Sequence, residues 1–269
     1  MRASLLFIVC MTWSCATRYE KNCEAPAEYR KKSVATILKE AKAIVSRPGE
    51  KRAVVFGLYG NKKQYVKGLL ENIEMAKDMY PTWDVVAFID SATVPKEAIA
   101  EAKARGAVVK ESPDYNSASA RFYILDLPEY DRFIVRDADS RIYPREVAAV
   151  ADWMKNDWAI LHGMRDAHNH LDPLLGGMWG AVSKRLREKL ELAFHSPSMQ
   201  DLYKEYIGNR KAVYGDDQIF LKEYVVKAVG PDHFLSHETF LCHAFPNSRG
   251  FPIPRGNAGV HIGAVRNVD

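Results

Sequence analysis

Two aspartates, one residue apart, follow a short apolar run in the middle of the chain. The stretch FIVRDADSRIYPRE (133–146) places Asp137 and Asp139 directly after the run at 133–135. Hard divalent cations such as Mg²⁺ and Mn²⁺ prefer carboxylate oxygens, and their remaining coordination positions suit water or phosphate. The pair therefore predicts a metal site that grips a diphosphate. The alternative is a solvated turn that caps a helix at 144–155.

Three arginines lie close to this pair in the sequence, namely Arg121, Arg136 and Arg141. The planar guanidinium group matches phosphate oxygens well, so we predict that Arg121 and Arg136 contact the phosphates of the ligand. Each arginine has the alternative of a surface ion pair, which is the more common fate of a charged side chain. Arg121 is the strongest candidate, because a charge within the apolar segment SASARFYILD needs a reason.

The segment GGMWG (176–180) combines small residues with an aromatic one. The paired glycines Gly176 and Gly177 permit a close approach between backbone and ligand, and Trp179 offers a flat apolar face on which a sugar ring can stack. The alternative is a turn with a tryptophan in the core. The sequence leaves both interpretations open.

The segment GDDQ (215–218) places Asp216 and Asp217 at the start of a predicted helix. Negative charge is favoured there by the helix dipole, so capping alone explains one of the two carboxylates. The other is free to face a cleft and to remove a proton from an acceptor hydroxyl as a general base. We predict Asp217 in this role, with Asp216 as the second candidate.

The histidines do not form a recognisable zinc pattern. The stretch HGMRDAHNH (162–170) lacks the i, i+4 spacing of a helical zinc pair, so we reject a zinc site there. His243 and His261 lie near the end of the chain, where one of them could complete the coordination shell of the ion. We predict His261 as that ligand, with a structural imidazole as the alternative.

Strands and helices alternate along the first half of the chain. Apolar runs predict strands at 52–60, 83–90, 107–112, 133–135 and 157–163, and helical periodicity predicts helices at 33–46, 62–80, 95–106, 117–127, 144–155, 184–194 and 215–229. Such alternation is typical of an α/β fold with a mostly parallel sheet between helices. Asp137 and Asp139 then lie at the carboxyl end of a strand, where open α/β sheets bind ligands.

Composition indicates a folded protein with no nucleic-acid partner. The chain has 269 residues, 47% of them hydrophobic, and a net charge of +4 without a basic arm. Residues 1–16 resemble a secretory signal peptide, which predicts an extracytoplasmic location and no stable membrane span after its removal. A membrane anchor or a cytoplasmic protein is the alternative. A lead-in with one helix follows at 17–50, and the main domain is predicted at 51–269.

Four cysteines are present, and two of them lie inside the predicted signal peptide. Cys23 and Cys242 remain in the mature chain. They could form one disulfide in an oxidising compartment, and the sequence alone leaves the pairing open.

Taken together, these segments resemble the GT-A type of nucleotide-sugar glycosyltransferase, in particular small domains of large algal viruses and of bacterial polysaccharide clusters. The matching segments are, in order, SASARFYILD, RDADSRIYPRE, HGMRDAHNH, PLLGGMWGA, GDDQIFL, and FLCHAF followed by the proline-rich tail. The resemblance covers roughly 52–265. The resemblance implies a single GT-A domain, a nucleoside-diphosphate sugar donor, a glycan or other hydroxyl acceptor, and bound Mn²⁺ or Mg²⁺. It assigns the metal to Asp137 and Asp139, and the border of the sugar pocket to Gly176, Gly177 and Trp179.

Two other functions fit parts of the sequence. A phosphatase of the haloacid dehalogenase type also carries an aspartate pair after an apolar strand, although Arg141 stands where its pattern has threonine or valine. A non-catalytic protein of the same fold could bind a sugar nucleotide or a glycan without turnover. We favour an enzyme over such a binding protein, because the acid pair occurs together with GDDQ, and we expect a hexosyl- or deoxyhexosyltransferase.

Overall fold

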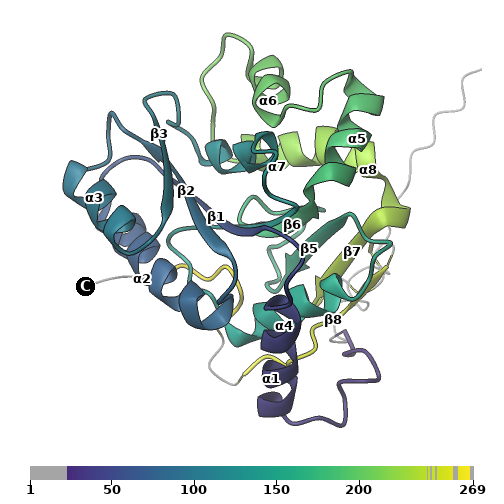
Figure 1. Ribbon diagram of the computed structural model, residues 1–269. Coiled ribbons are helices and arrows are strands. Elements are labelled where there is room, and N and C mark those ends of the chain that lie inside the picture. The colour runs from purple at the N-terminus through teal and green to yellow at the C-terminus, as the bar shows by residue number, and fades with distance from the viewer. Residues whose placement is uncertain (1–22, 241, 243, 246, 257–259, 267–269) are drawn as a thin grey trace, which may run out of the picture.

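A mixed sheet of eight strands forms the centre of the molecule (Figure 1). The computed structural model describes residues 23–240, 242, 244–245, 247–256 and 260–266. The strands are β1 (Arg52–Leu58), β2 (Asp84–Asp90), β3 (Val108–Ser112), β4 (Arg132–Arg136), β5 (Leu161–Arg165), β6 (Met178–Val182), β7 (Phe234–Glu238) and β8 (Ser248–Gly250). They stand in the order β3-β2-β1-β4-β6-β5-β7-β8.

Most strand pairs are parallel. β3, β2, β1 and β4 run in one direction, as do β5, β7 and β8, and β6 runs antiparallel to both of its neighbours, β4 and β5. This arrangement confirms the predicted α/β class with a mostly parallel sheet. The carboxyl ends of β4 and β5 meet at one edge of the sheet, and the antiparallel β6 starts there.

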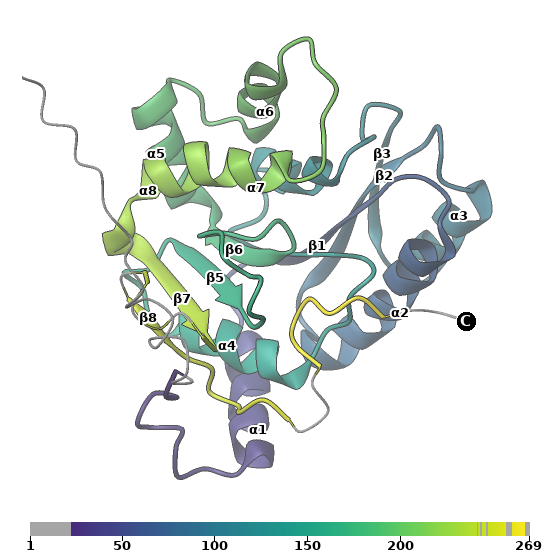
Figure 2. The same cartoon turned by 180° about the vertical axis from the view of Figure 1, so that it is seen from behind.

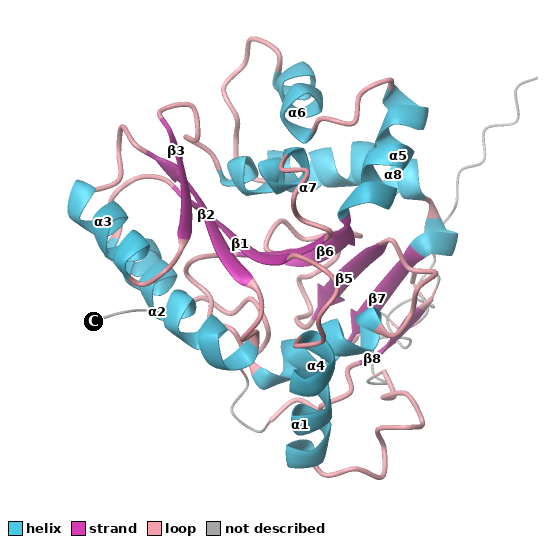
Figure 3. Cartoon of the chain, in the orientation of Figure 1, coloured by secondary structure: helices cyan, strands magenta, loops and turns pink. Residues whose placement is uncertain are grey.

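Helices cover both faces of the sheet (Figures 2 and 3). They are α1 (Val34–Val45), α2 (Lys63–Met79), α3 (Lys96–Ala104), η2 (Ala118–Asp126), α4 (Pro144–Met154), α5 (Ser183–Phe194), α6 (Met199–Ile207), α7 (Asp216–Phe220), η3 (Leu221–Val226), α8 (Lys227–Val229) and η4 (Pro231–His233). One hydrophobic core contains side chains of the helices α1, α2, α3 and α4, together with strand residues such as Phe56 and Ile134. The other contains side chains of η2 and of the helices from α5 through α8, together with strand residues such as Val55 and Phe133. Successive strand residues point to opposite faces, so both cores use the same strands.

The structure differs from the predicted elements in the second half of the chain. β6 was not predicted, because its glycine-containing sequence MWGAV follows two further glycines and is typical of a loop. β7 was missed because its buried Ser236, His237 and Glu238 interrupt an apolar run. The helix predicted at 117–127 is the 3₁₀ helix η2, and the one predicted at 215–229 is π-helical at Leu221–Val226.

The N-terminal segment packs onto the same sheet. Ser33 caps α1, with its hydroxyl accepting a hydrogen bond from the Thr36 amide at 3.2 Å, and α1 packs on α4. Cys23 forms a disulfide with Cys242, which settles the pairing that the sequence leaves open. The Cys23 amide also donates to the Thr239 carbonyl at 3.0 Å, so the segment is fixed at the end of β7. The predicted signal peptide lies outside the described residues.

Candidate functional site

Arg121 joins two aspartates and a backbone carbonyl at the carboxyl edge of the sheet. Its Nη1 lies 2.8 Å from Oδ1 of Asp137, its Nη2 lies 3.2 Å from Oδ2 of Asp217, and its Nε donates to the Gly176 carbonyl at 3.0 Å. The three charged residues come from η2, the end of β4 and the start of α7, which are far apart in the sequence. We call Arg121, Asp137, Asp139 and Asp217, with Gly176 and Gly177, the acidic cluster.

The cluster is neither fully buried nor fully open. The Asp137 side chain is 36% exposed, the Asp217 side chain 17% and the Arg121 side chain 6%. Arg121 is thus held inside the protein while Asp137 reaches solvent. A ligand that enters at Asp137 would meet a fixed positive charge directly behind the carboxylate.

Helix α2 positions the loop that carries the two acids. Asn72 of α2 donates through its side-chain amide to the Ser140 carbonyl at 2.8 Å, and its oxygen accepts from the Ile142 amide at 3.1 Å. Gly68 lies so close to the loop that a Cβ atom there would overlap with the Ala138 carbonyl. A larger residue at this position would therefore push the loop away from the helix.

Two glycines allow the acids to approach the start of β6. A Cβ atom on Gly176 would overlap with the carboxylate of Asp217, and one on Gly177 would overlap with the carboxylate of Asp137. The close approach seen at GGMWG is thus between the backbone and side chains of the cluster, and the predicted approach of a ligand to this backbone stays a prediction. These glycines leave room for the acids and do not need an unusual backbone angle.

Asp139 is the more buried member of the pair. Burial raises the pKa of its carboxyl above the usual value, and the negative charge of Asp137 raises this pKa further, while Arg121 and a hydrogen bond from Tyr65 act in the opposite direction. The Asp139 carbonyl also accepts a hydrogen bond from the Arg266 amide at 2.9 Å, so the C-terminal tail passes over this residue. The two carboxylates repel each other, and a cation beside them would relieve that repulsion.

The two aspartates of GDDQ have different surroundings. Burial, followed by the charge of Asp137, raises the pKa of Asp217, with Arg121 opposing the rise. Asp216 instead accepts hydrogen bonds from both Nη atoms of Arg210, at 2.7 and 2.9 Å. These bonds, together with one from the Val213 amide, lower the pKa of Asp216 to about 2. The alternative prediction of Asp216 as the general base does not fit this geometry, because the Asp216 carboxylate binds Arg210 and the Val213 amide.

Two predicted donor contacts are not at the site. Arg136 is 2% exposed, and its Nε lies 2.8 Å from the buried carboxylate of Glu146. Trp179 is fully buried, and its ring meets those of Phe122 and Phe133 edge to face at 5.5 and 5.2 Å. The predictions that Arg136 contacts phosphate and that Trp179 stacks on a sugar are therefore wrong, because both side chains point into the protein.

Arg141 is also directed away from a ligand. Its Nε lies 2.6 Å from Glu71 of α2, and its Nη1 donates to the Ser140 carbonyl at 2.9 Å. Its side chain is 1% exposed. Arg141 thus fixes the acid-bearing loop to α2, and its place beside the acids in the sequence reflects this structural role.

Four of the eight histidines form two pairs in the structure. His162 and His237 are fully buried, with their rings joined by a hydrogen bond of 2.8 Å, and burial lowers the pKa of both. His170 and His261 have ring centres 5.2 Å apart near the acidic cluster, and burial, followed by the charge of His261, lowers the pKa of His170 to about 4. The role of His261 as a metal ligand stays a prediction. His243 lies outside the described residues.

Three residues near the acids were not predicted. Tyr65 of α2 forms a hydrogen bond with Asp139, and Asn72 binds the acid-bearing loop. His170 lies close enough to Asp137 for its negative charge to raise the pKa of the imidazole, against the larger effect of burial. Tyr65 and Asn72 sit on a helix with an ordinary amphipathic pattern, so nothing in the sequence distinguishes them. His170 lies in the HGMRDAHNH stretch, which the sequence analysis considers only as a zinc site.

Replacing Gly177 with alanine should displace Asp137. The added Cβ atom overlaps with the carboxylate, so the side chain must rotate away from Arg121. We expect the turnover measured in the donor assay described below to fall about 100-fold, the loss that a displacement of roughly 1 Å can cause. Gly256→Ala is the control, since nothing lies within 4 Å of a Cβ atom there. Equal turnover in the two variants would contradict this prediction.

The sequence matches no protein-family model, and no curated protein matches it. Its fold is similar to that of glucosyl-3-phosphoglycerate synthase from Mycobacterium tuberculosis in complex with phosphoglyceric acid, with a TM-score of 0.51 and 14% identity, covering 92% of this chain and 81% of that chain. A second structure of that synthase has a TM-score of 0.49 and 14% identity, covering 77% and 75%. Mannosyl-3-phosphoglycerate synthase from Rubrobacter xylanophilus has a TM-score of 0.42 and 14% identity, covering 80% and 82%.

These neighbours have the GT-A fold of nucleotide-sugar glycosyltransferases. The eight-stranded, mostly parallel sheet between two helical layers agrees with the 0.51 match along nearly the whole chain. The fold of this protein is therefore that of the GT-A glycosyltransferases. At 14% identity the similarity concerns the fold and not the substrates.

Proposed function

We propose that this protein is a metal-dependent glycosyltransferase that moves a hexosyl or deoxyhexosyl group from a nucleoside-diphosphate sugar to a hydroxyl group of a glycan or another acceptor. The observation that carries the proposal is the acidic cluster. Arg121, Asp137 and Asp217 meet at the carboxyl edge of the sheet in a GT-A fold, where α/β sheets bind their ligands. Polysaccharide biosynthesis is the process that we expect such a reaction to serve.

The residues present fit Mn²⁺ or Mg²⁺. Asp137 and Asp139 offer oxygen ligands. Burial, followed by the charge of Asp137, raises the pKa of Asp139, and a cation beside the two carboxylates would offset their repulsion. Within the part of the chain that the structure describes, no group of three or more His, Cys, Asp or Glu side chains is arranged to hold a metal. Mg²⁺ is usually bound through one or two protein carboxylates, with substrate phosphates and water as its other ligands. When bound, the ion supplies positive charge to the diphosphate leaving group.

The other side chains of the cluster have separate roles in the proposed reaction. Arg121, held by Asp137, Asp217 and the Gly176 carbonyl, orients both carboxylates and adds positive charge beside the diphosphate. Asp217 accepts the proton of the acceptor hydroxyl as that oxygen attacks the anomeric carbon, which inverts the configuration of the sugar. Its raised pKa suits a base, because a carboxylate with a higher pKa binds a proton more strongly.

Donor hydrolysis and transfer test the proposal. A panel of nucleoside-diphosphate sugars is incubated with the protein, with and without Mn²⁺ or Mg²⁺, and nucleoside diphosphate release is measured. We expect one donor class to turn over, and a chelator to abolish turnover. Binding of a sugar nucleotide that needs no metal and leads to no turnover would instead support a non-catalytic binding protein.

Asp139→Ala should remove metal-dependent turnover and leave the protein folded. We expect a loss of about 100-fold or more, because the ion would lose one of the two carboxylates proposed to hold it. Asp78→Ala is the matched control, since Asp78 is 70% exposed and forms an ion pair with Lys42 on the surface. Unchanged turnover with unchanged metal dependence in the Asp139 variant would contradict the assignment.

We further propose that the protein works in an oxidising, extracytoplasmic compartment. Structural disulfides persist in such compartments, and Cys23 pairs with Cys242. The signal-like residues 1–16 point in the same direction. Within the described part of the chain, no helix has the length and apolar character needed to cross a bilayer.

A further inference from the structure

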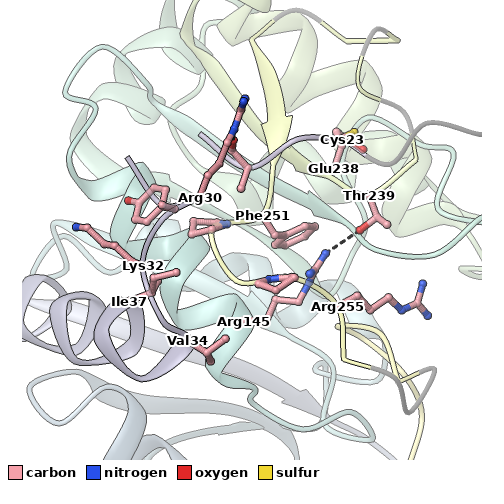
Figure 4. Close-up of a pocket in the computed structure, with 14 residues that line it drawn as sticks. Cys23, Arg30, Lys32, Val34, Ile37, Arg145, Glu238, Thr239, Phe251 and Arg255 are labelled. Atoms are coloured by element: carbon pink, nitrogen blue, oxygen red, sulfur yellow. Dashed lines mark hydrogen bonds between the residues drawn. The ribbon is translucent and has the colours of Figure 1, made fainter. Parts of the chain in front are cut away.

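A cavity lies apart from the acidic cluster. Its volume is 420 Å³, within the range that binds small molecules, and its lining does not include Arg121, Asp137 or Asp217. Half of the lining residues belong to the N-terminal segment between Cys23 and Ile37 (Figure 4). The others come from the start of α4, the end of β7 and residues 251–255. The N-terminal segment, fixed by the disulfide, thus forms one wall of the cavity.

The charged groups of this lining are mostly positive. They are Arg30, Lys32, Arg145 and Arg255, against the single carboxylate of Glu238. The Glu238 carboxylate forms a buried ion pair with Arg165, so it contributes little negative charge to the cavity. The lining therefore carries more positively charged than negatively charged side chains.

Two of these cations are available for a ligand. Arg30 pairs with Glu24, and Lys32 pairs with Glu40, with side chains 53% and 35% exposed for the cations and 75% and 44% exposed for the acids. Exposed pairs of this kind contribute little stability, so a ligand anion can replace the surface acids at small cost.

A third cation is fixed in place. Arg145 donates to Thr239 at 2.9 Å and to the Ile253 carbonyl at 2.6 Å, and it pairs with Asp166 at 3.0 Å. Its guanidinium carbon also lies 4.0 Å from the centre of the Phe251 ring. Figure 4 shows this side chain reaching across the cavity toward Thr239. A cation held by several partners needs no ordering when an anion binds, which favours affinity.

We propose that this cavity binds a small anionic molecule, one that carries a phosphate or carboxylate group on an uncharged body. The cations at the wall bind the anionic group, and apolar side chains such as Ile37, Phe251 and Pro252 contact the body. A free phosphate ion would leave most of the 420 Å³ unfilled. The proposal does not depend on the transferase reaction, because it concerns binding at a separate set of residues.

Calorimetry with three probes of similar size tests the proposal. The full-length protein is titrated with glucose 6-phosphate, glucuronate and neutral glucose in the presence of a chelator. We expect at least one of the anions to bind about tenfold or more tightly than glucose, a difference that one charge-assisted contact can supply. The preference between the two anions identifies the phosphate or the carboxylate as the group recognised.

A double variant locates the binding. Arg30→Gln with Lys32→Gln removes two cations from exposed pairs, and we expect the affinity for the bound anion to fall about tenfold or more. The matched control is Arg105→Gln with Lys77→Gln, which removes the same charges from exposed pairs with Glu101 and Glu74 away from the cavity. Thermal unfolding confirms that both variants are folded. Equal binding of glucose, absence of anion binding at about 10 mM, or equal affinities in the two double variants would overturn the proposal.

Discussion

Asp217→Asn should lower the rate constant for sugar transfer by about 10²–10⁴-fold, the contribution of a general base. The asparagine keeps the shape and the oxygen near Arg121, but it cannot take the proton of the acceptor hydroxyl. Donor affinity should change little, because the variant leaves Asp137 and Asp139 in place. Steady-state transfer kinetics, together with direct measurement of nucleotide binding, separate the two effects.

The pH profile gives a second measure of the same role. Burial and the charge of Asp137 raise the pKa of Asp217 above the ordinary aspartate value of 3.8. A base acts only when deprotonated, so activity is present above this raised pKa and is lost as the pH falls through it. The variant should lose this acid limb. Glu223→Gln, at an exposed position further along the same helical segment, is the control. An Asp217 variant with the turnover and pH profile of the native protein would exclude the assignment.

Removing the disulfide between Cys23 and Cys242 should lower the free energy of unfolding by about 5 kcal/mol in the chain-entropy model. The two cysteines are separated by 219 positions, so the bond restricts almost the whole unfolded chain. The variant with Cys23→Ser and Cys242→Ser is compared with the native protein by denaturant unfolding. The same comparison in the presence of a reducing agent should bring the native protein to the stability of the variant.

The double variant also provides the control for this prediction. A reducing agent should leave its unfolding midpoint unchanged, because the relevant bond is already absent. Equal stability of the native and variant proteins under oxidising conditions would contradict the prediction, because the disulfide would then add nothing to the free energy of unfolding.

The sequence predicted the sheet edge and the acid pair because both depend on local patterns. An apolar run that ends in two acids shows where a buried strand stops, and the alternation of strands and helices shows that such ends gather at one edge. β6 was not predicted, since a strand of five residues with a central glycine has no local pattern that distinguishes it from a turn. Its pairing with β4 and β5 is decided by tertiary contacts.

The residue types of the site were predictable, but the directions of its side chains were not. Arg121 and Arg136 are equally plausible phosphate contacts in the sequence, and only the fold shows that Glu146 binds Arg136 inside the protein. In the same way Asp216 and Asp217 are adjacent and chemically identical. Arg210, six positions before Asp216, binds that carboxylate and leaves Asp217 to face the cluster. Such choices depend on partners that meet only after folding.

The reversed direction of β6 bears on how this protein could acquire new specificity. β5 ends and β6 begins at the same edge of the sheet, so the intervening residues 166–177 leave this edge and return to it, where Gly176 and Gly177 lie against the acidic cluster. Changes in the exposed and half-buried residues 167–173 would reshape the surface on this side of the acidic cluster, while Asp166 stays paired with Arg145 and every strand keeps its register. The segment can therefore diversify between related proteins as an exchangeable module, while the two glycines that precede β6 keep the acids in place.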